Sequence, residues 1–455
     1  MKPMKRMKTT MNLKPRVQRI ALAGGLFFIL STAHLFTPGQ FMDGATYAAV
    51  SRNLAQGLGS AWDLWYTPEL YPQFVEHPPL HFWLQSSLFY LWGDQWWVED
   101  IYAILIWLLT ALGIDRLGRW SGLSQRAIQW SLLLWTAIPI VTWTYGNNLL
   151  ETTLSASMVW TSATMIYGLR RNQWGYLFLG GLWIAAGALT KGPVALFPLA
   201  VPFWWHIAGN TLHAPIRRIA LDSTAVLAGL LLPWLILWNL SEPHAYLSAY
   251  WSKQVVHSLE AIQTVSSRWY ILGSFAMQML IPAIIALGVR RFRPLSEGPW
   301  RLSPRSIAFA FIALSAVLPI MISLKQRDFY AVPAYPFAAL ALASFLDGHR
   351  KTGKTIHPRI LWQWTLGLWA LGFALRTLPE VHMSKDFTLR QSIYQAAKTH
   401  RGQTLYAADS LLQDWNLIAQ CARVGEMYLK AETADSLAPG PRLIYKEGRV
   451  FVFED

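Results

Sequence analysis

The chain has 455 residues, of which 53% are hydrophobic and only 14% are charged, and it contains 25 tryptophans. This composition is too apolar for an ordinary soluble protein of this length and favours a polytopic membrane protein. The net charge of +14 does not indicate a nucleic-acid-binding protein, because the basic residues form short clusters between apolar segments. The single cysteine, Cys421, excludes an internal disulfide and a cysteine-based metal cluster.

Apolar segments long enough to cross a bilayer follow one another through most of the chain. A crossing needs about 20 apolar residues, and about eleven segments approach this length. The predicted spans are 20–36, 98–114, 127–144, 149–169, 174–189, 194–208, 219–240, 269–289, 306–324, 331–346 and 360–378. They predict an all-α membrane domain over residues 1–378, with outer loops at 37–97 and 241–268.

The composition changes in the last part of the chain, residues 379–455, to that of a small soluble module. Alternating apolar and polar residues predict short strands at 442–445 and 449–453, and a helix is predicted over 388–399. We therefore expect a small α/β domain after the last membrane span.

Basic residues are distributed unevenly between the loops. Seven Lys or Arg residues precede the first span, and in this threading the cytoplasmic segments hold 23, against six in the outer segments before the C-terminal module. The positive-inside rule therefore places the N-terminus in the cytoplasm and the C-terminal module outside. The first span lacks a clear small-residue cleavage site, so we expect a retained helix of a multi-pass protein in the cytoplasmic (inner) membrane.

The outer segment 41–84 is polar, aromatic and rich in carboxylates, and it is where we expect the chemistry. Tyr47, Val50 and Leu54 recur at helical spacing, as in a helix that lies on a membrane surface. Asp43 precedes them. Its carboxylate could be a general base for an incoming hydroxyl or amine, or simply the N-cap of this helix.

Further along this segment comes Glu76-His77-Pro78-Pro79. Two prolines fix the backbone and hold the preceding side chains at the start of a helix. His77 at a helix N-terminus could receive a phosphate, and Glu76 could ligate a divalent metal. The alternative is a plain helix-start turn. His257, in the outer loop 241–268, would join Glu76 only if the fold brings the two together.

Four charged residues downstream stand out because they lie at the outer ends of apolar spans. Glu151 could hold an acceptor or assist the base, although a first-turn carboxylate is also favoured by the helix dipole. Lys191, Lys325 and Arg327 violate the charge bias of this side, so an anionic ligand such as a phosphate would explain them. Snorkelling side chains are the alternative.

Taken together, these segments resemble the membrane glycosyltransferases of the protein O-mannosyltransferase and aminoarabinose-transferase (ArnT-like) superfamily, which have the GT-C fold. The resemblance covers roughly residues 41–346. It is carried, in this order, by DGATYA at 43–48, EHPPL at 76–80, LTKGP at 189–193 and the segment 325–336. Two residues depart from the family pattern: Gly44 stands where a second acid is common, and His77 where many relatives have Lys.

The resemblance implies an enzyme that moves a sugar from a polyprenyl-phosphate donor to a lipid, glycan or protein acceptor on the outer face of the membrane. By this likeness Asp43 is the catalytic base and Glu151 a second acid near the acceptor. His77, Lys191, Lys325 and Arg327 are candidate phosphate contacts, and Glu76 with His257 resembles a divalent-metal pair. In-line attack would invert the anomeric centre.

Two other classes of function fit part of the pattern. A transporter or flippase for a lipid-linked sugar would also need many helices and phosphate-binding cations, but its ionisable residues should lie at mid-membrane and repeats are common. Here the ionisable residues lie in outer loops and no repeat is visible, so an enzyme is favoured. A glycan-binding or assembly subunit without catalysis is the third possibility.

Overall fold

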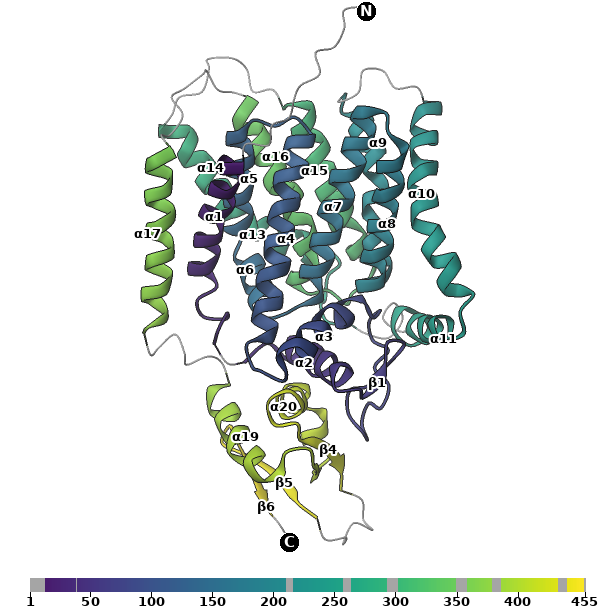
Figure 1. Ribbon diagram of the computed structural model, residues 1–455, viewed down its shortest axis with the longest axis vertical. Helices are drawn as coiled ribbons and strands as arrows, with labels where there is room; N and C mark the ends of the chain where they lie inside the picture. The colour runs from purple at the N-terminus through teal and green to yellow at the C-terminus, as the bar shows by residue number, and fades with distance from the viewer. Residues whose placement is uncertain are drawn as a thin grey trace, which may run out of the picture.

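Two parts lie one below the other in the computed structural model: a bundle of upright helices and, beneath it, a small unit that contains a sheet (Figure 1). The structure describes residues 13–37, 39–209, 216–256, 263–292, 302–348, 358–378, 386–432 and 440–453.

Helices occupy each of the predicted spans. They are α1 (Leu13–Leu30), α4 (Val98–Trp120), α5 (Gln125–Thr136), α6 (Pro139–Gly146), α7 (Leu150–Arg171), α8 (Trp174–Lys191), η1 (Gly192–Ala200), α9 (Val201–Ile207), α10 (Ile216–Trp238), α13 (Tyr270–Gln278), α14 (Leu280–Phe292), α15 (Pro304–Val317), η3 (Leu318–Ile322), η4 (Asp328–Ala334), α16 (Tyr335–Gly348) and α17 (Pro358–Arg376).

Fewer of these helices have the length and apolarity of a full membrane span than were predicted. Within the described residues six qualify, or seven if α5 and α6, which meet at a bend of 66°, form one span. Trp174–Ile207 counts once where two spans were predicted, and α1, α7 and α17 are not among the six. The predicted helices are therefore confirmed, whereas eleven crossings remain a prediction.

Three short helices cross the lower end of the bundle: α2 (Met42–Ala55), α3 (Leu80–Trp92) and α11 (Ser241–Tyr250), which is followed by η2 (Trp251–Val256) (Figure 1). A two-stranded ribbon of β1 (Gly59–Ser60) and β2 (Asp63–Leu64) lies between α2 and α3 in sequence. The expected surface position of α2 is wrong. Nearly every residue from Gly44 to Asn53 is buried, because α3 packs on one side of α2 and the C-terminal unit on another.

The C-terminal unit comprises the described residues from 386 to 453. Its elements are α19 (Phe387–His400), β3 (Thr404–Ala407), η5 (Leu411–Gln413), α20 (Trp415–Gln420), η6 (Cys421–Gly425), β4 (Tyr428–Ala431), β5 (Arg442–Lys446) and β6 (Arg449–Phe453). The sheet order is β4-β3-β5-β6, with β3 parallel to both neighbours and β5 antiparallel to β6. The predicted helix and last two strands are confirmed. The other two strands, of four residues each, were missed.

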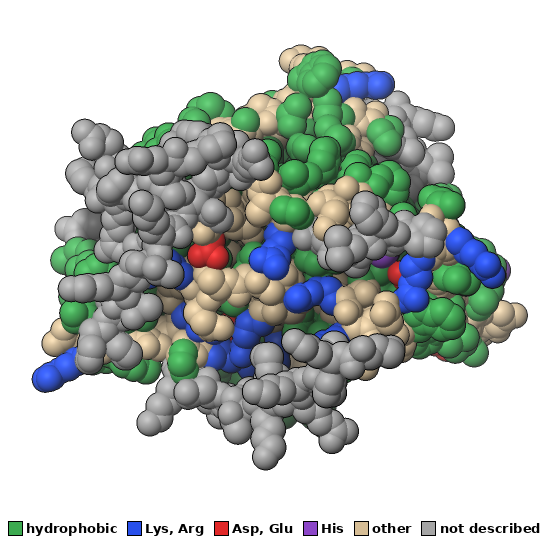
Figure 2. Space-filling view, turned by 90° about the horizontal axis from the view of Figure 1, so that it is seen from above, with side chains coloured by type: hydrophobic (Ala, Val, Ile, Leu, Met, Phe, Trp, Pro, Cys, Tyr) green, Lys and Arg blue, Asp and Glu red, His purple; other side chains and the backbone are tan. Residues whose placement is uncertain are grey.

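The end of the bundle opposite the C-terminal unit is basic. Figure 2, which looks onto this end, shows more Lys and Arg than Asp and Glu among the described side chains. Arg16, Arg19 and Arg119 surround the buried Asp115 there. This distribution agrees with the charge bias in the sequence, and the orientation in a membrane stays a prediction from that bias.

Helices α8 and α10 approach each other at a pair of glycines. A Cβ atom at Gly181 would overlap the carbonyl oxygen of Val226, and one at Gly229 would overlap the carbonyl oxygen of Phe178. Small residues let two helix backbones pack this closely in membrane proteins. The α8–α10 contact therefore depends on the absence of side chains at these two positions.

We expect Gly181→Val to lower the free energy of unfolding by about 1–3 kcal/mol, because the added side chain must push α8 and α10 apart. Thermal unfolding of the purified protein in detergent measures this as a lower Tm. Gly175→Ala is the matched control, since Gly175 lies in the same helix with open space around its Cα. Equal melting temperatures for the Gly181 variant and wild type would contradict the close contact.

Candidate active site

Asp43 lies in the first turn of α2, at the boundary between the helix bundle and the C-terminal unit. The N-cap of α2 is Phe41, so the alternative that Asp43 is the N-cap is wrong. The start of the helix is fixed to the turn between α6 and α7. The Phe41 amide donates to Asn147 Oδ1 at 2.7 Å, and Asn148 Nδ2 donates to the Gly44 carbonyl at 3.3 Å.

The same turn leaves no room for a side chain at Gly44. A Cβ at Gly44 would overlap the carbonyl oxygen of Asn147, so no side chain fits between α2 and the α6–α7 turn. Asn148 also exchanges hydrogen bonds with Gln85 of α3, at 2.7 and 3.3 Å. Helices α2, α3 and α7 thus meet at one polar junction beside Asp43.

Glu151 and Lys191 form an ion pair close to this junction. Glu151 lies in the first turn of α7 and is 1% exposed, and its carboxylate accepts a hydrogen bond from Lys191 at the end of α8. The Lys191 ammonium also lies 4.5 Å from the centroid of the Tyr330 ring, a cation–π distance. The structure therefore pairs the two residues predicted here, and Lys191 already has a carboxylate partner.

Both acidic and basic side chains lie near Asp43. Burial raises the pKa of Asp43 to about 6, and the nearby Glu151 carboxylate adds to the rise. Lys191, Arg327 and Lys325 act in the opposite direction. A carboxylate with a pKa near 6 is largely ionised at neutral pH yet basic enough to accept a proton, which suits a general base.

His77 lies against α2 and α11. Its Nε2 is 3.1 Å from the Tyr47 hydroxyl, and its carbonyl accepts a hydrogen bond of 2.7 Å from the Tyr246 hydroxyl of α11. Burial lowers the pKa of His77 well below its usual value, and the positive charges of Lys191 and Lys325 lower it further. His77 is therefore neutral at physiological pH, so it can meet a phosphate only through a ring N–H.

Glu76 and Lys325 influence each other across this region. Burial raises the pKa of Glu76 while Lys325 opposes the rise, and burial lowers the pKa of Lys325 while Glu76 opposes the fall. The expected metal partner of Glu76, His257, lies outside the described residues. Among the residues that the structure describes, no three His, Cys, Asp or Glu side chains converge as metal ligands.

No role was predicted from the sequence for two tyrosines and a histidine that lie at this site. The Tyr250 hydroxyl packs against Gly192, next to Lys191. The Tyr246 hydroxyl donates to the carbonyls of Phe74 and His77. Helix α11 therefore contacts both the end of α8 and the 74–77 loop. The four-residue spacing of the two tyrosines on a predicted outer loop was the available signal. Behind them, His81 Nδ1 lies 3.0 Å from Thr153 Oγ1, which ties α3 to α7 two residues after Glu151.

An aromatic groove of about 430 Å³ opens beside the charged cluster. Its lining includes Phe41, Trp143 and Phe329, with Arg327 and Asp328 at its polar part, and the Tyr270 hydroxyl donates a hydrogen bond to the Asp328 carboxylate. Trp143 and Phe329 stack at 5.9 Å between ring centroids. The groove lies at the bend between α5 and α6, where Pro139 begins the second helix. It can therefore receive an apolar chain whose anionic end points to Arg327.

Comparisons with known proteins bear on the fold. The sequence model of the dolichyl-phosphate-mannose-protein mannosyltransferase family matches residues 76–238. A comparison with curated protein sequences found no match. The crystal structure of ArnT from Cupriavidus metallidurans bound to undecaprenyl phosphate is similar with a TM-score of 0.64 and 18% identity, over 93% of this chain and 87% of ArnT.

Archaeal structures are similar as well. The oligosaccharyltransferase AglB from Archaeoglobus fulgidus, in complex with an inhibitory peptide and a dolichol-phosphate, gives a TM-score of 0.51 at 12% identity, over 92% of this chain and 64% of AglB. The Archaeoglobus fulgidus oligosaccharyltransferase in complex with Zn and sulfate gives 0.50 at 13% identity, over 90% of this chain and 62% of that one.

The chain therefore has the GT-C fold. The similarity in fold to ArnT and the match of residues 76–238 to the mannosyltransferase family model agree with the motif resemblance. The apolar helices of the chain make it a multi-pass membrane protein.

We expect Lys191→Met to raise the pKa of Asp43 above about 6, because the substitution removes a nearby positive charge and leaves Glu151 without its partner. Infrared difference spectra of the carboxyl stretch, referenced to Asp43→Asn, measure this titration in reconstituted protein. Lys253→Met, at an exposed lysine of η2, is the control and should leave the pKa unchanged. A pKa of Asp43 that falls or stays the same in Lys191→Met would contradict the arrangement.

Proposed function

We propose that the protein is a glycosyltransferase that moves a sugar from a polyprenyl-phosphate donor to a lipid, glycan or protein acceptor. The observation that carries this proposal is the gathering of Asp43, Glu151 and Lys191 from three distant segments at one end of a GT-C bundle. Lys325 and Arg327, from a fourth segment, are close enough to influence Asp43. A carboxylate that can take a proton and cations that can stabilise a phosphate are both needed for a transfer reaction, and here they lie close together.

In the proposed reaction Asp43 removes the proton from the acceptor hydroxyl or amine as the acceptor attacks the anomeric carbon. The bond from that carbon to the donor phosphate oxygen breaks, and the polyprenyl phosphate leaves with the electron pair. Lys325 and Arg327 stabilise the charge that develops on the phosphate. Attack opposite the leaving group inverts the anomeric centre.

Glu151 has a supporting part in this proposal. Its ion pair with Lys191 holds the ends of α7 and α8 together beside Asp43. Its negative charge also keeps the pKa of Asp43 raised, which makes the carboxylate a stronger base. His77, neutral and held by Tyr47, would contact the donor phosphate through a ring N–H.

The aromatic groove of Phe41, Trp143 and Phe329 is proposed to hold the start of the polyprenyl chain. ArnT and AglB structures with undecaprenyl phosphate and dolichol-phosphate support a carrier of this class. Arg327 lines the groove and also influences Asp43, so it links the lipid to the reaction centre. We further propose that this end of the bundle, and the C-terminal unit, face outward from the cytoplasmic membrane, as the charge bias predicts.

We expect Asp43→Asn to lower sugar transfer by about 10²–10⁴-fold, because an amide cannot accept the proton. Transfer of labelled sugar from synthetic polyprenyl-phosphate sugars to an acceptor mixture, with and without chelator, measures it. The acid limb of the wild-type kcat/KM profile should lie near the pKa of about 6, with activity falling as the pH drops below it. Asp409→Asn, at an exposed carboxylate, is the control.

The product of the same assay should have the inverted anomeric configuration, and a product with retained configuration would contradict the in-line mechanism. Folded protein that binds the carrier but gives neither transfer nor carrier hydrolysis across the panel would favour a lipid-linked-sugar transporter instead.

We expect Arg327→Gln to raise the donor KM about tenfold or more, since a hydrogen bond to a charged group contributes about 1.5–3 kcal/mol. Initial rates at varied donor concentration separate KM from kcat. Lys446→Gln, at an exposed lysine of β5, should change neither value. A donor KM equal to that of wild type in the Arg327 variant would contradict the proposed contact between Arg327 and the donor phosphate.

A further inference from the structure

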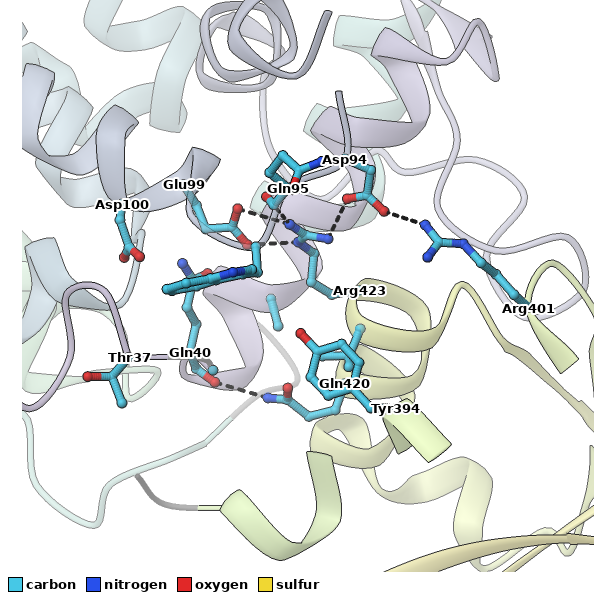
Figure 3. Close-up of a pocket in the computed structure, with 14 residues that line it drawn as sticks. Thr37, Gln40, Asp94, Gln95, Glu99, Asp100, Tyr394, Arg401, Gln420 and Arg423 are labelled. Atoms are coloured by element: carbon cyan, nitrogen blue, oxygen red, sulfur yellow. Dashed lines mark hydrogen bonds and ion pairs between the residues drawn. The ribbon is translucent and has the colours of Figure 1, made fainter. Parts of the chain in front are cut away.

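A buried ionic cluster joins the C-terminal unit to the bundle (Figure 3). At its centre is Arg423 of η6. Its guanidinium contacts both oxygens of Glu99, at 2.7 and 3.0 Å, and Asp94 Oδ1 at 2.7 Å. A further bond of 3.0 Å reaches the Gln95 carbonyl. Arg423 thereby fastens the C-terminal unit to the start of α4.

Helix α2 takes part in this cluster through its last turn. Arg52 is 1% exposed and donates to the backbone carbonyl of Arg423 at 3.4 Å. Its guanidinium also lies 3.8 Å from Asp94 and 3.6 Å from Glu426. Arg401 bridges the same two carboxylates from outside, at 2.9 and 2.6 Å. The three arginines and the carboxylates of Asp94, Glu99 and Glu426 balance in charge.

The other end of α2 is held by the C-terminal unit as well. Gln420, the last residue of α20, is 1% exposed and donates from Nε2 to the Gln40 carbonyl at 3.0 Å (Figure 3). Gln40 lies three residues before Asp43. Helix α2 also packs along α20 and η6 between these two points. The C-terminal unit therefore contacts α2 at its entry, along its length and at its last turn.

We propose that the C-terminal unit fixes the position of Asp43 through Arg423 and Gln420, which are positioning residues for the transfer reaction. This inference rests on the proposed function of Asp43. The two residues touch no reacting atom. They hold α2 between the unit and the bundle, and that position keeps Asp43 buried beside Glu151 and Lys191.

The electrostatics explain why this contact holds α2 firmly. A buried carboxylate is tolerated when a cation and hydrogen bonds compensate it. Replacing Arg423 with a neutral residue leaves Asp94 and Glu99 without their main partner in a small space. A cavity of about 130 Å³ that Asp94, Glu99 and Ala45 of α2 help to line adjoins them. Water in an enlarged cavity would then solvate the carboxylates, and α2 would lose close packing on this side. Asp43 gains solvent, which lowers its pKa toward the ordinary value.

The test compares full-length Arg423→Gln with wild type in lipid nanodiscs by two measurements. In hydrogen–deuterium exchange, the amides of α2 should exchange at least tenfold faster in the variant, while those of α7 stay unchanged. In the transfer assay, kcat should fall at least tenfold while the donor KM stays within about twofold of wild type. The acid limb of the kcat/KM profile should move to lower pH. A loss of folded protein alone would not shift that limb.

The pH readout isolates the position of Asp43. The titratable and charged groups near Asp43 are Glu151, Lys191, Lys325 and Arg327, together with Glu76, Tyr47 and Tyr330. All of them lie outside the C-terminal unit and keep their identity in the variant. Arg423→Lys, which keeps the charge but loses the two-pronged contact with Glu99, should recover part of the exchange protection and of kcat. Arg449→Gln, at an exposed arginine of the same unit, should match wild type in both measurements.

Gln420→Leu provides a milder, uncharged variant should Arg423→Gln fail to fold. It removes the hydrogen bond to the Gln40 carbonyl. Exchange of the α2 amides should be faster, kcat lower and the acid limb at lower pH, each by less than in Arg423→Gln. Wild-type exchange in α2 together with a wild-type acid limb, in either folded variant, would overturn the proposal. The exchange result does not depend on activity. If the wild-type protein transfers no sugar but α2 exchanges faster in the variants, the proposed function is rejected while the contact with α2 is supported.

Discussion

Burial of one short helix on two sides is the constraint on which the rest of the site depends. Helix α2 lies between the bundle and the C-terminal unit, and nearly all its residues from Gly44 to Asn53 are buried. Because the helix is enclosed, the carboxylate in its first turn is partly removed from water. The missing side chain at Gly44 allows the approach to Asn147 that completes this enclosure.

Several of the charges near Asp43 compensate one another. Glu151 is paired with Lys191, and Glu76 and Lys325 moderate each other. Such pairing permits several ionised groups in a place with little solvent. It also means that Lys191, expected from its position to await a phosphate, already has a partner, whereas Arg327 is exposed. In the proposed reaction the cations nearest the carrier are thus on the 325–327 segment.

Much of the fold and part of the site could be predicted from the sequence. Long apolar runs specify helices locally, so α4, α7 and α10 were found close to their observed bounds. Asp43, Glu151, Lys191 and Lys325 were predicted because charge is costly at the end of a membrane span, and the structure brings them close together, while their roles stay a proposal. The roles of Tyr246 and Arg423 could not be predicted, since each depends on a contact between segments more than 150 residues apart. Strands β3 and β4 are too short for a reliable alternation.

The bend between α5 and α6 has a consequence for how a substrate arrives. Pro139 begins the second half of a bent membrane span, and Trp143 and Phe329 line the groove there, so the opening lies at a break in a candidate span. A lipid carrier that uses this opening reaches the protein by diffusion in two dimensions. Saturation would then follow the mole fraction of carrier in the bilayer, and diluting the vesicles at constant lipid composition would leave the turnover rate unchanged.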